Sequence, residues 1–389
     1  MGVREYLVVS LVVGARLVLP LAIPYVPLPA IISCLIIDAA DHAIFKRFPA
    51  IDLAGYQSYD KALDTYYLTI AYLATVRNWR NQAAFRVGRF LFYYRLLGAL
   101  VFELTQLRVL LFVFPNTFEY FFIFCEIVLL RWDLRRLTLN SAILAAGTIW
   151  VFVKLPMEWW IHIARIDTVS FLEANWPYLV VSILGIAALV WWAVAHVAPA
   201  AGHPSRLRSG DHPLRFRAPP LPAPLRGGEL YRTMLARARI FDRALLEKAV
   251  LATMVMVIFS RIFADQIRAS LLQIVLSVVI LVTLNALGSQ LLARRGRSWK
   301  SVAAEFGAML LMNLGLAFAV VLLHRVLGPP GSSSPIQVML FFVVLLTLII
   351  VLFDRYHTVA LVERLLVSTG EMDGEGRPVA TSGKGALSS

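Results

Sequence analysis

The sequence is poor in charge, in cysteine and in catalytic motifs. Only 16% of its 389 residues are charged and 59% are apolar, whereas a soluble domain is about one quarter charged and about half apolar. The two cysteines, Cys34 and Cys125, each lie in an apolar run without CxxC spacing, which argues against a disulfide framework and a thiolate zinc site. Motifs for serine or cysteine nucleophiles, phosphate-binding loops, dinucleotide-binding loops and zinc proteases are missing as well. This composition indicates a protein embedded in a membrane.

The charge that is present is mostly positive. The formal net charge is +13, and arginine collects between the apolar runs, as it does where a bilayer sets the orientation of a chain. No basic patch alternates with aromatic residues on a soluble module, so nucleic acid is not an expected partner. We expect a multi-pass protein of the cell (inner or plasma) membrane, with membrane lipids as its partners. The sequence carries no signal for its oligomeric state.

Long apolar runs predict the fold class. A membrane-spanning helix needs about 20 apolar residues, and the sequence offers about eleven such runs in groups of seven and four. We therefore predict an all-α, polytopic transmembrane helix bundle. The expected spans are 6–26, 28–45, 58–76, 89–113, 117–131, 139–155 and 177–198, followed by 247–264, 269–293, 303–326 and 335–353.

A proline-rich stretch separates the two groups of spans. Residues 199–228 contain seven prolines and five arginines and have no apolar period, so they predict an extended linker. This places an N-terminal membrane domain at 1–198 and a C-terminal membrane domain at 229–366, the latter a support or a partner surface. Residues 229–246 have the spacing of a helix on the membrane surface. The Gly- and Ser-rich tail, 367–389, is expected to be disordered.

Basic loops predict the orientation. Arginines and lysines gather at 77–89, 131–136 and 294–300, and the positive-inside bias assigns these loops, the linker and the C-terminus to the cytoplasm. The opposite loops include 46–57 and a turn at 114–117, where Pro115 and Asn116 stand. Successive loops alternate between the two sides of the membrane. With eleven spans and the basic loops in the cytoplasm, this alternation places the N-terminus and residues 46–57 outside.

Four aspartates stand at the mouth of two apolar segments. Carboxylates are costly beside hydrocarbon, which favours a functional role for them. Their spacing of three and of four residues places each pair on one helical face, and four carboxylates that meet repel each other unless a hard divalent cation or nearby bases balance them. The aspartates are Asp38, Asp41, Asp60 and Asp64. The structural alternative is ion pairing with Lys46, Arg47 and Lys61.

This stretch resembles the signature DxxDGxxARx(8)GxxxDxxxD of the CDP-alcohol phosphatidyltransferases. The resemblance covers about 30 residues and includes three departures: His42 replaces the Gly, Phe45 replaces the Ala, and Lys46 replaces the Arg. The last spacing, from Gly55 to Asp60, is one residue longer than in the family. Matching positions are Asp38, Asp41, Gly55, Asp60 and Asp64, and Arg16 in the first span also resembles the family's pattern.

The resemblance implies a metal-dependent reaction. In that family the first three aspartates hold a divalent metal, so Asp38, Asp41 and Asp60 would bind Mg²⁺ or Mn²⁺. The fourth activates the acceptor hydroxyl, a catalytic role that falls on Asp64. The family works from the cytoplasmic face, whereas the alternation of loops across the membrane places residues 46–57 outside.

Further polar side chains are candidates for substrate binding. The guanidinium of Arg95 can hold a phosphate or carboxylate through two hydrogen bonds, or it can pair with an acid between two helices. Glu158 and His162 belong to a polar stripe with Lys154 and Arg165, which could close a headgroup pocket or face solvent on an amphipathic helix. The stretch 154–167 also resembles a recurring segment of uncharacterised bacterial multi-span membrane proteins. The full set of substrate-binding candidates is His42, Lys46, Lys61, Arg95, Glu158 and His162.

Two functions of different classes fit this pattern. The first is a membrane-embedded, metal-dependent transferase that acts on a lipid or lipid-linked phosphate. The alternative is a transporter or membrane scaffold in which the acidic cluster forms an ion or proton relay. Broken helices or an internal repeat that links the two halves would favour the transporter.

Overall fold

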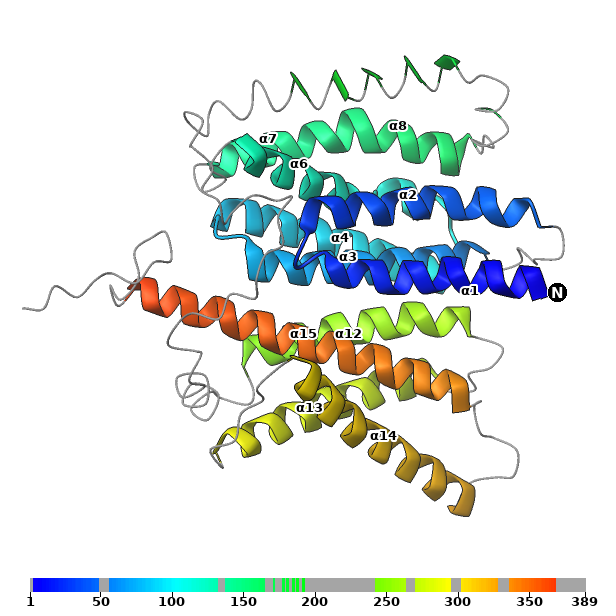
Figure 1. Cartoon of the computed structure of the whole chain (residues 1–389), viewed down its shortest axis with the longest axis vertical. Helices are drawn as coiled ribbons and strands as arrows, with labels where there is room; N and C mark the ends of the chain where they lie inside the picture. The colour runs from blue at the N-terminus through cyan, green and yellow to red at the C-terminus, as the bar shows by residue number, and fades with distance from the viewer. Residues whose placement is uncertain are drawn as a thin grey trace, which may run out of the picture.

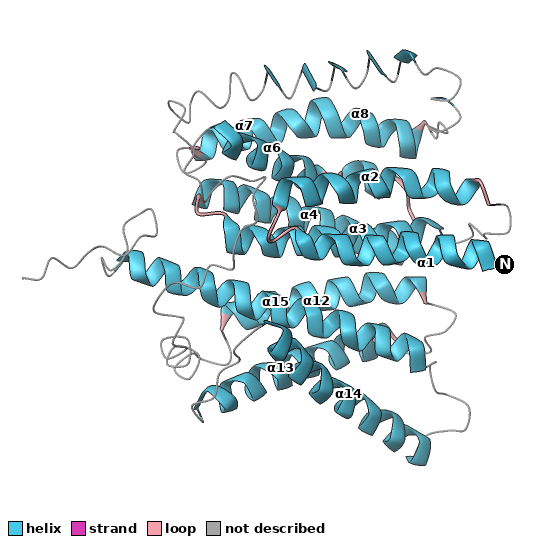
Figure 2. Cartoon of the chain, viewed as in Figure 1, coloured by secondary structure: helices cyan, strands magenta, loops and turns pink. Residues whose placement is uncertain are grey.

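The computed structural model describes residues 3–48, 56–131, 137–164, 242–263, 270–294, 302–327 and 336–368, and scattered residues between 171 and 192. Within these residues every regular element is helical and no strand occurs (Figure 2). Most helices lie side by side with their axes roughly parallel, while α14 crosses obliquely (Figure 1). The predicted all-α class is confirmed for this part of the chain.

The helix bounds follow the apolar runs closely. A charged or proline-containing segment separates most neighbouring helices, because proline and exposed charge both interrupt a membrane helix. The N-terminal helices are α1 (Val3–Val18) with the 3₁₀ turn η1 (Leu19–Ala22), α2 (Pro27–Lys46), α3 (Tyr56–Asn78), α4 (Gln82–Thr105), α5 (Val109–Val113), α6 (Thr117–Arg131), α7 (Leu139–Ile149) and α8 (Leu155–Glu158). Two π-helical turns, η3 (Trp150–Lys154) and η4 (Trp159–Ile163), flank α8. The C-terminal helices are α12 (Arg243–Ile262), α13 (Leu271–Arg294), α14 (Val302–Leu327) and α15 (Ile336–Ser368).

Six helical segments of the described chain are long and apolar enough to cross a membrane. Others, such as α4 with its four charged side chains, are long enough but more polar. The predicted count of eleven spans, and their division into seven and four, is therefore not confirmed. The predicted span 177–198, the linker and the tail 369–389 lie largely or wholly outside the described residues. The six segments are Val3–Ala22, Pro27–Lys46, Val109–Leu129, Leu139–Ile161, Leu271–Leu291 and Ile336–Thr358.

Helix α3 is the contact between the N-terminal and C-terminal helices. It packs against α4 on one side and against α12 and α15 on the other, so it is buried almost all round, as the side chains from Ala62 to Ala74 show. Tyr72 stacks on Phe92 of α4 with 4.4 Å between ring centroids, and its hydroxyl donates to Glu247 of α12. Glu247 also pairs with Arg89 of α4 at 2.9 Å. One hydrophobic core therefore includes residues from both groups.

The chain reverses direction earlier than the sequence predicted. Helix α4 ends at Thr105, and Gln106 adopts a left-handed conformation with φ of 56°. Helix α5 then runs back along α4 and is interrupted before α6, so that Val109–Leu129 forms one span with a break inside it. The expected turn at 114–117 is instead this break, and the reversal lies at 106–108. The apolar run continues through residue 113, so hydrophobicity alone could not locate the reversal.

Side chains of α4 donate hydrogen bonds to the backbone at the interruption between α5 and α6. Arg95 donates a hydrogen bond of 2.9 Å to the Phe114 carbonyl, and the Tyr94 hydroxyl donates one of 2.9 Å to the Val113 carbonyl. These bonds satisfy acceptors that a continuous helix would have paired, as a span in hydrocarbon requires. Gly98 allows the close approach, because a Cβ placed there would lie 2.1 Å from the Cβ of Phe114.

We therefore predict that Gly98→Ala destabilises the protein. The added methyl group overlaps Phe114, and overpacking of this kind costs about 1–3 kcal/mol. Thermal unfolding of the full chain in detergent measures the loss. Gly147→Ala is the matched control, since a Cβ at that helical glycine meets nothing within 4 Å and should leave the melting temperature equal or slightly higher. Equal melting temperatures for Gly98→Ala and the wild type would contradict the described approach of α4 and the break.

Candidate functional site

Three helices bring Arg16 and the four aspartates to one place inside the bundle. Arg16 comes from α1, Asp38 and Asp41 from α2, and Asp60 and Asp64 from α3. Asp38 precedes the last residue of α2 by eight positions and Asp64 follows the first residue of α3 by eight, which is roughly 12 Å at 1.5 Å per residue. Asp41 and Asp60 lie nearer to the same end, at roughly 8 and 6 Å. The site therefore lies within about three helical turns of the end of the bundle where α2 ends and α3 begins.

Arg16 is the centre of this site. Its guanidinium donates hydrogen bonds to Asp38 and Asp41, to Asp60 at 3.2 Å and to Asp64 at 3.0 Å. A planar guanidinium with five N–H donors is the side chain best suited to several carboxylates at once. The cluster formed by Arg16, the four aspartates and Lys61 is called the acidic centre below.

Lys61 is the second cation of the acidic centre. Its ammonium group lies 2.7 Å from one oxygen of Asp60 and 3.3 Å from one oxygen of Asp64. Lys61 and Arg16 thus share the carboxylates of Asp60 and Asp64. Carboxylates buried this close to one another are costly unless cations balance them.

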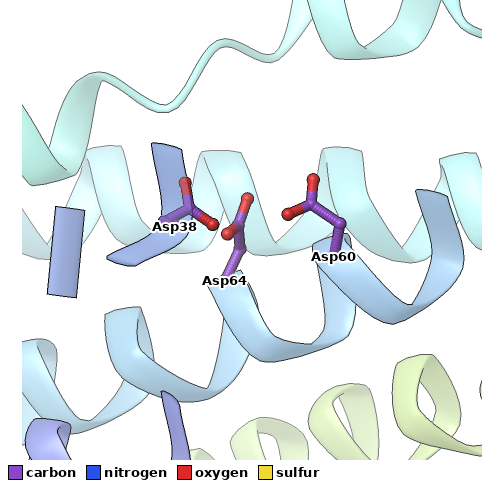
Figure 3. A group of neighbouring side chains, drawn as sticks. All are labelled: Asp38, Asp60 and Asp64. Atoms are coloured by element: carbon purple, nitrogen blue, oxygen red, sulfur yellow. The ribbon is translucent and has the colours of Figure 1, made fainter. Parts of the chain in front are cut away.

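Three of the four carboxylates are close enough to share a metal ion. Oxygen atoms of Asp38, Asp60 and Asp64 all lie within 4.8 Å of one another, and their side chains point toward one another from α2 and α3 (Figure 3). Carboxylate oxygens are the ligands that Mg²⁺, Mn²⁺ and Ca²⁺ prefer. The donor set therefore fits a hard divalent cation.

The acidic centre is open on one side. The side chains of Asp38 and Asp60 are 23% and 16% exposed, whereas Asp41 is completely buried. Asp41 is bonded to Arg16 but is not one of the three whose oxygens converge. Any ion or substrate would approach from the side of Asp38 and Asp60.

The bases named from the sequence differ in their positions. Lys61 pairs with the aspartates as the structural alternative predicted, while Lys46 and Arg47 are exposed at the C-terminal end of α2. The side chain of His42 lies outside what the structure describes. Sequence reasoning assigned the pairing to Lys46, Arg47 and Lys61 and overlooked Arg16 as the main partner, although it is the one charge within the first apolar run.

A second polar group surrounds the break between α5 and α6. Glu119, in the first turn of α6, accepts hydrogen bonds from the Tyr67 hydroxyl at 2.7 Å and from Asn116 Nδ2 at 2.9 Å. The hydroxyl of Thr117 is buried and has no hydrogen-bond partner among the described residues. Sequence reasoning did not select Tyr67 or Glu119 as site residues. The available signal was an acid placed directly after a Pro–Asn break in an apolar run.

Lys154 and Glu158 form a buried ion pair next to this group. Their charged atoms lie 3.1 Å apart and both side chains are buried, so the alternative of a solvated amphipathic helix is wrong for these two residues. Lys154 also lies over the ring of Tyr120, at 4.9 Å from its centroid. The surrounding π-helical turns are a deviation that often accompanies functional sites. The side chain of His162 and the whole of Arg165 fall outside the described residues.

Arg95 has a partner that the sequence did not suggest. Its guanidinium donates a hydrogen bond to the Phe114 carbonyl at the helix break. Its side chain is buried, so it holds the break in place from the inside of the bundle.

No family model, no curated protein and no solved structure matches the chain. The role of the acidic centre is therefore argued from its geometry, its charge and the resemblance of its signature.

We predict that Arg16→Gln destabilises the protein strongly. The substitution leaves mutually repelling carboxylates without their shared cation, and removing one partner of a buried ion pair costs about 3–5 kcal/mol. Thermal unfolding of the full chain in metal-free detergent solution measures the effect. Arg4→Gln removes an exposed arginine from the same helix and should change stability by no more than about 0.5 kcal/mol. If both variants unfold like the wild type, Arg16 does not hold the acidic centre together.

Proposed function

We propose that the protein is a membrane-embedded, metal-dependent transferase that acts on a lipid or lipid-linked phosphate. The observation that carries this proposal is the convergence of oxygen atoms from Asp38, Asp60 and Asp64. Three carboxylate oxygens at this spacing fit Mg²⁺ or Mn²⁺. The resemblance to the CDP-alcohol phosphatidyltransferases supplies the reaction class.

The geometry favours a ligand set that differs from the one implied by the resemblance. Asp64 takes the place of Asp41 as the third ligand, because its oxygen lies with those of Asp38 and Asp60. Asp41 instead orients Arg16 from the buried side. Asp64 is itself oriented, since one oxygen accepts from Arg16 and the other from Lys61.

The side chains of the acidic centre can recognise a phosphate group. Arg16 and Lys61 place N–H donors directly beside the open carboxylates, and such donors bind phosphate oxygens through charge-assisted hydrogen bonds. A bound divalent cation would neutralise a diphosphate and stabilise the charge that develops during transfer. The role that the resemblance implies for Asp64, accepting the proton of an acceptor hydroxyl, would require one of its oxygens to be released from Arg16 or Lys61.

A second candidate function is an ion or proton relay. It is favoured by the interrupted helix α5–α6, because transporters commonly bind ions where a helix is broken inside the membrane. Tyr67 stands three residues after Asp64 on α3 and donates to Glu119 at the break. Titratable side chains thus continue from the acidic centre toward Glu119, and beyond it lies the pair Lys154–Glu158.

The metal site is tested by thermal unfolding of the full chain against Mg²⁺, Mn²⁺ and Ca²⁺. We expect millimolar metal to raise the melting temperature of the wild type, since a ligand at one hundred times its Kd stabilises by about 2.7 kcal/mol. Asp38→Asn and Asp60→Asn should abolish this shift, because each removes a charged ligand but keeps a hydrogen-bonding amide.

Asp242→Asn is the matched control for these variants. Asp242 is exposed and caps α12 through its side chain, a task that asparagine performs equally well, so its metal response should equal that of the wild type. Metal-dependent release of the nucleotide from a CDP-linked lipid then tests the transferase reaction itself. If none of the three metals changes the melting temperature of the wild type, the proposal is wrong.

The relay is tested by flux through reconstituted vesicles. If Glu119 carries protons or cations, wild-type protein should dissipate an imposed pH or cation gradient, and Glu119→Gln should reduce the rate at least tenfold while keeping a hydrogen-bonding side chain. Glu5→Gln, on the exposed N-terminal turn of α1, serves as control and should behave like the wild type. If the wild type dissipates no gradient but binds metal and releases nucleotide, the relay is wrong and the transferase is supported.

A further inference from the structure

The outward face of α4 carries a groove that neither proposed function uses. Its volume is about 480 Å³, and its described lining comes from positions three or four residues apart on that helix, which places them on one face. We call this feature the α4 groove. It is lined by Arg86, Arg89, Phe90, Tyr93, Tyr94 and Leu97.

Two arginines stand at the edge of one end of the α4 groove, whose own surface is almost entirely apolar. Arg86 and Arg89 follow the start of α4 by four and seven residues, which is roughly 6 and 10 Å along the helix. Both are exposed, and Arg89 remains 48% exposed although it pairs with Glu247. Glu247 can balance only one of the two guanidinium charges. This end of the groove therefore offers the second charge to an anion.

The other end of the α4 groove is apolar and aromatic. Phe90 is 59% exposed and Leu97 is 45% exposed. Between them, Tyr94 stacks on Phe90 at 5.8 Å and packs against Trp150 at 5.0 Å between centroids. The distance from Arg86 to Leu97 is eleven residues, roughly 16 Å of helix. The groove thus runs from an end flanked by two arginines to an apolar, aromatic end.

The change from arginines at one end to apolar side chains at the other matches an amphiphile with a negatively charged headgroup. A soluble anion would leave the exposed Phe90 and Leu97 uncovered, and a neutral lipid would leave one guanidinium without a counter-charge. We infer that the α4 groove binds an anionic phospholipid, with its phosphate at Arg86 and Arg89 and one acyl chain along Phe90, Tyr94 and Leu97. Because residues 79–81, which connect α3 to α4, adjoin this end, the headgroup of the bound lipid lies on the side of that connection.

The test compares lipids in mixed micelles that contain the purified full chain. Phosphatidylglycerol should raise the melting temperature at a lower concentration than phosphatidylcholine with the same acyl chains. Arg86→Gln should raise the phosphatidylglycerol midpoint about fivefold, since one arginine near a membrane surface contributes about 1 kcal/mol. Arg86 is preferred to Arg89 because Arg89 also links α4 to α12 through Glu247.

Two controls keep the result interpretable. Arg4→Gln removes an exposed arginine from another helix and should leave the phosphatidylglycerol midpoint unchanged, and lipid-free Arg86→Gln should melt like the wild type. Phosphatidylglycerol with six-carbon chains should bind more weakly than the long-chain form, because it covers less of the apolar end. The inference is overturned by equal midpoints for the two headgroups, by equal midpoints for the two chain lengths, by an unaltered midpoint in Arg86→Gln, or by equal stabilisation from millimolar inorganic phosphate.

Discussion

The contact between one guanidinium and four carboxylates sets the arrangement of the first three helices. Arg16 reaches acids on both α2 and α3, so the rotation and the depth of each helix are determined by a single side chain. A charge inside a bilayer without partners is costly, and α1 therefore has one favourable register against its neighbours. The same contact concentrates negative charge where Asp38 and Asp60 remain partly open, which gives the centre its capacity to attract a cation.

The N-terminal helices depend in turn on the interruption of α5–α6. Because α5 runs back along α4, the first turn of α6 lies inside the bundle and places Glu119 next to Tyr67 on α3. The break stays closed because Arg95 and Tyr94 bind its carbonyl groups. Two buried polar groups therefore meet α3 three residues apart, one at Asp64 and one at Tyr67, and Lys154 pairs with Glu158 beside the second.

Much of the fold could be predicted because hydrophobic length is read directly from the sequence. The bounds of α2 and α6 agree with the expected spans within a few residues, and the spacing of the aspartates correctly indicated that they meet. The reversal at Gln106 could not be predicted, since it depends on the fit of Phe114 against Gly98 rather than on composition. The central position of Arg16 escaped prediction for a similar reason: a partner 22 to 48 residues away is chosen by helix packing, which no local pattern encodes. Lys154 and Glu158 were expected on a polar stripe, but only tertiary contacts decide whether such a stripe faces water or the core.

The position of α3 has a consequence for the biogenesis of the chain. Tyr72 is synthesised 175 residues before Glu247, the acid that its hydroxyl binds, and translation of that length takes roughly 10–35 s at 5–20 residues per second. During this interval the face of α3 that later contacts α12 and α15 has none of its final neighbours. The membrane insertion machinery, or lipid, must cover that face until the C-terminal helices arrive, so assembly of the core is completed only late in translation.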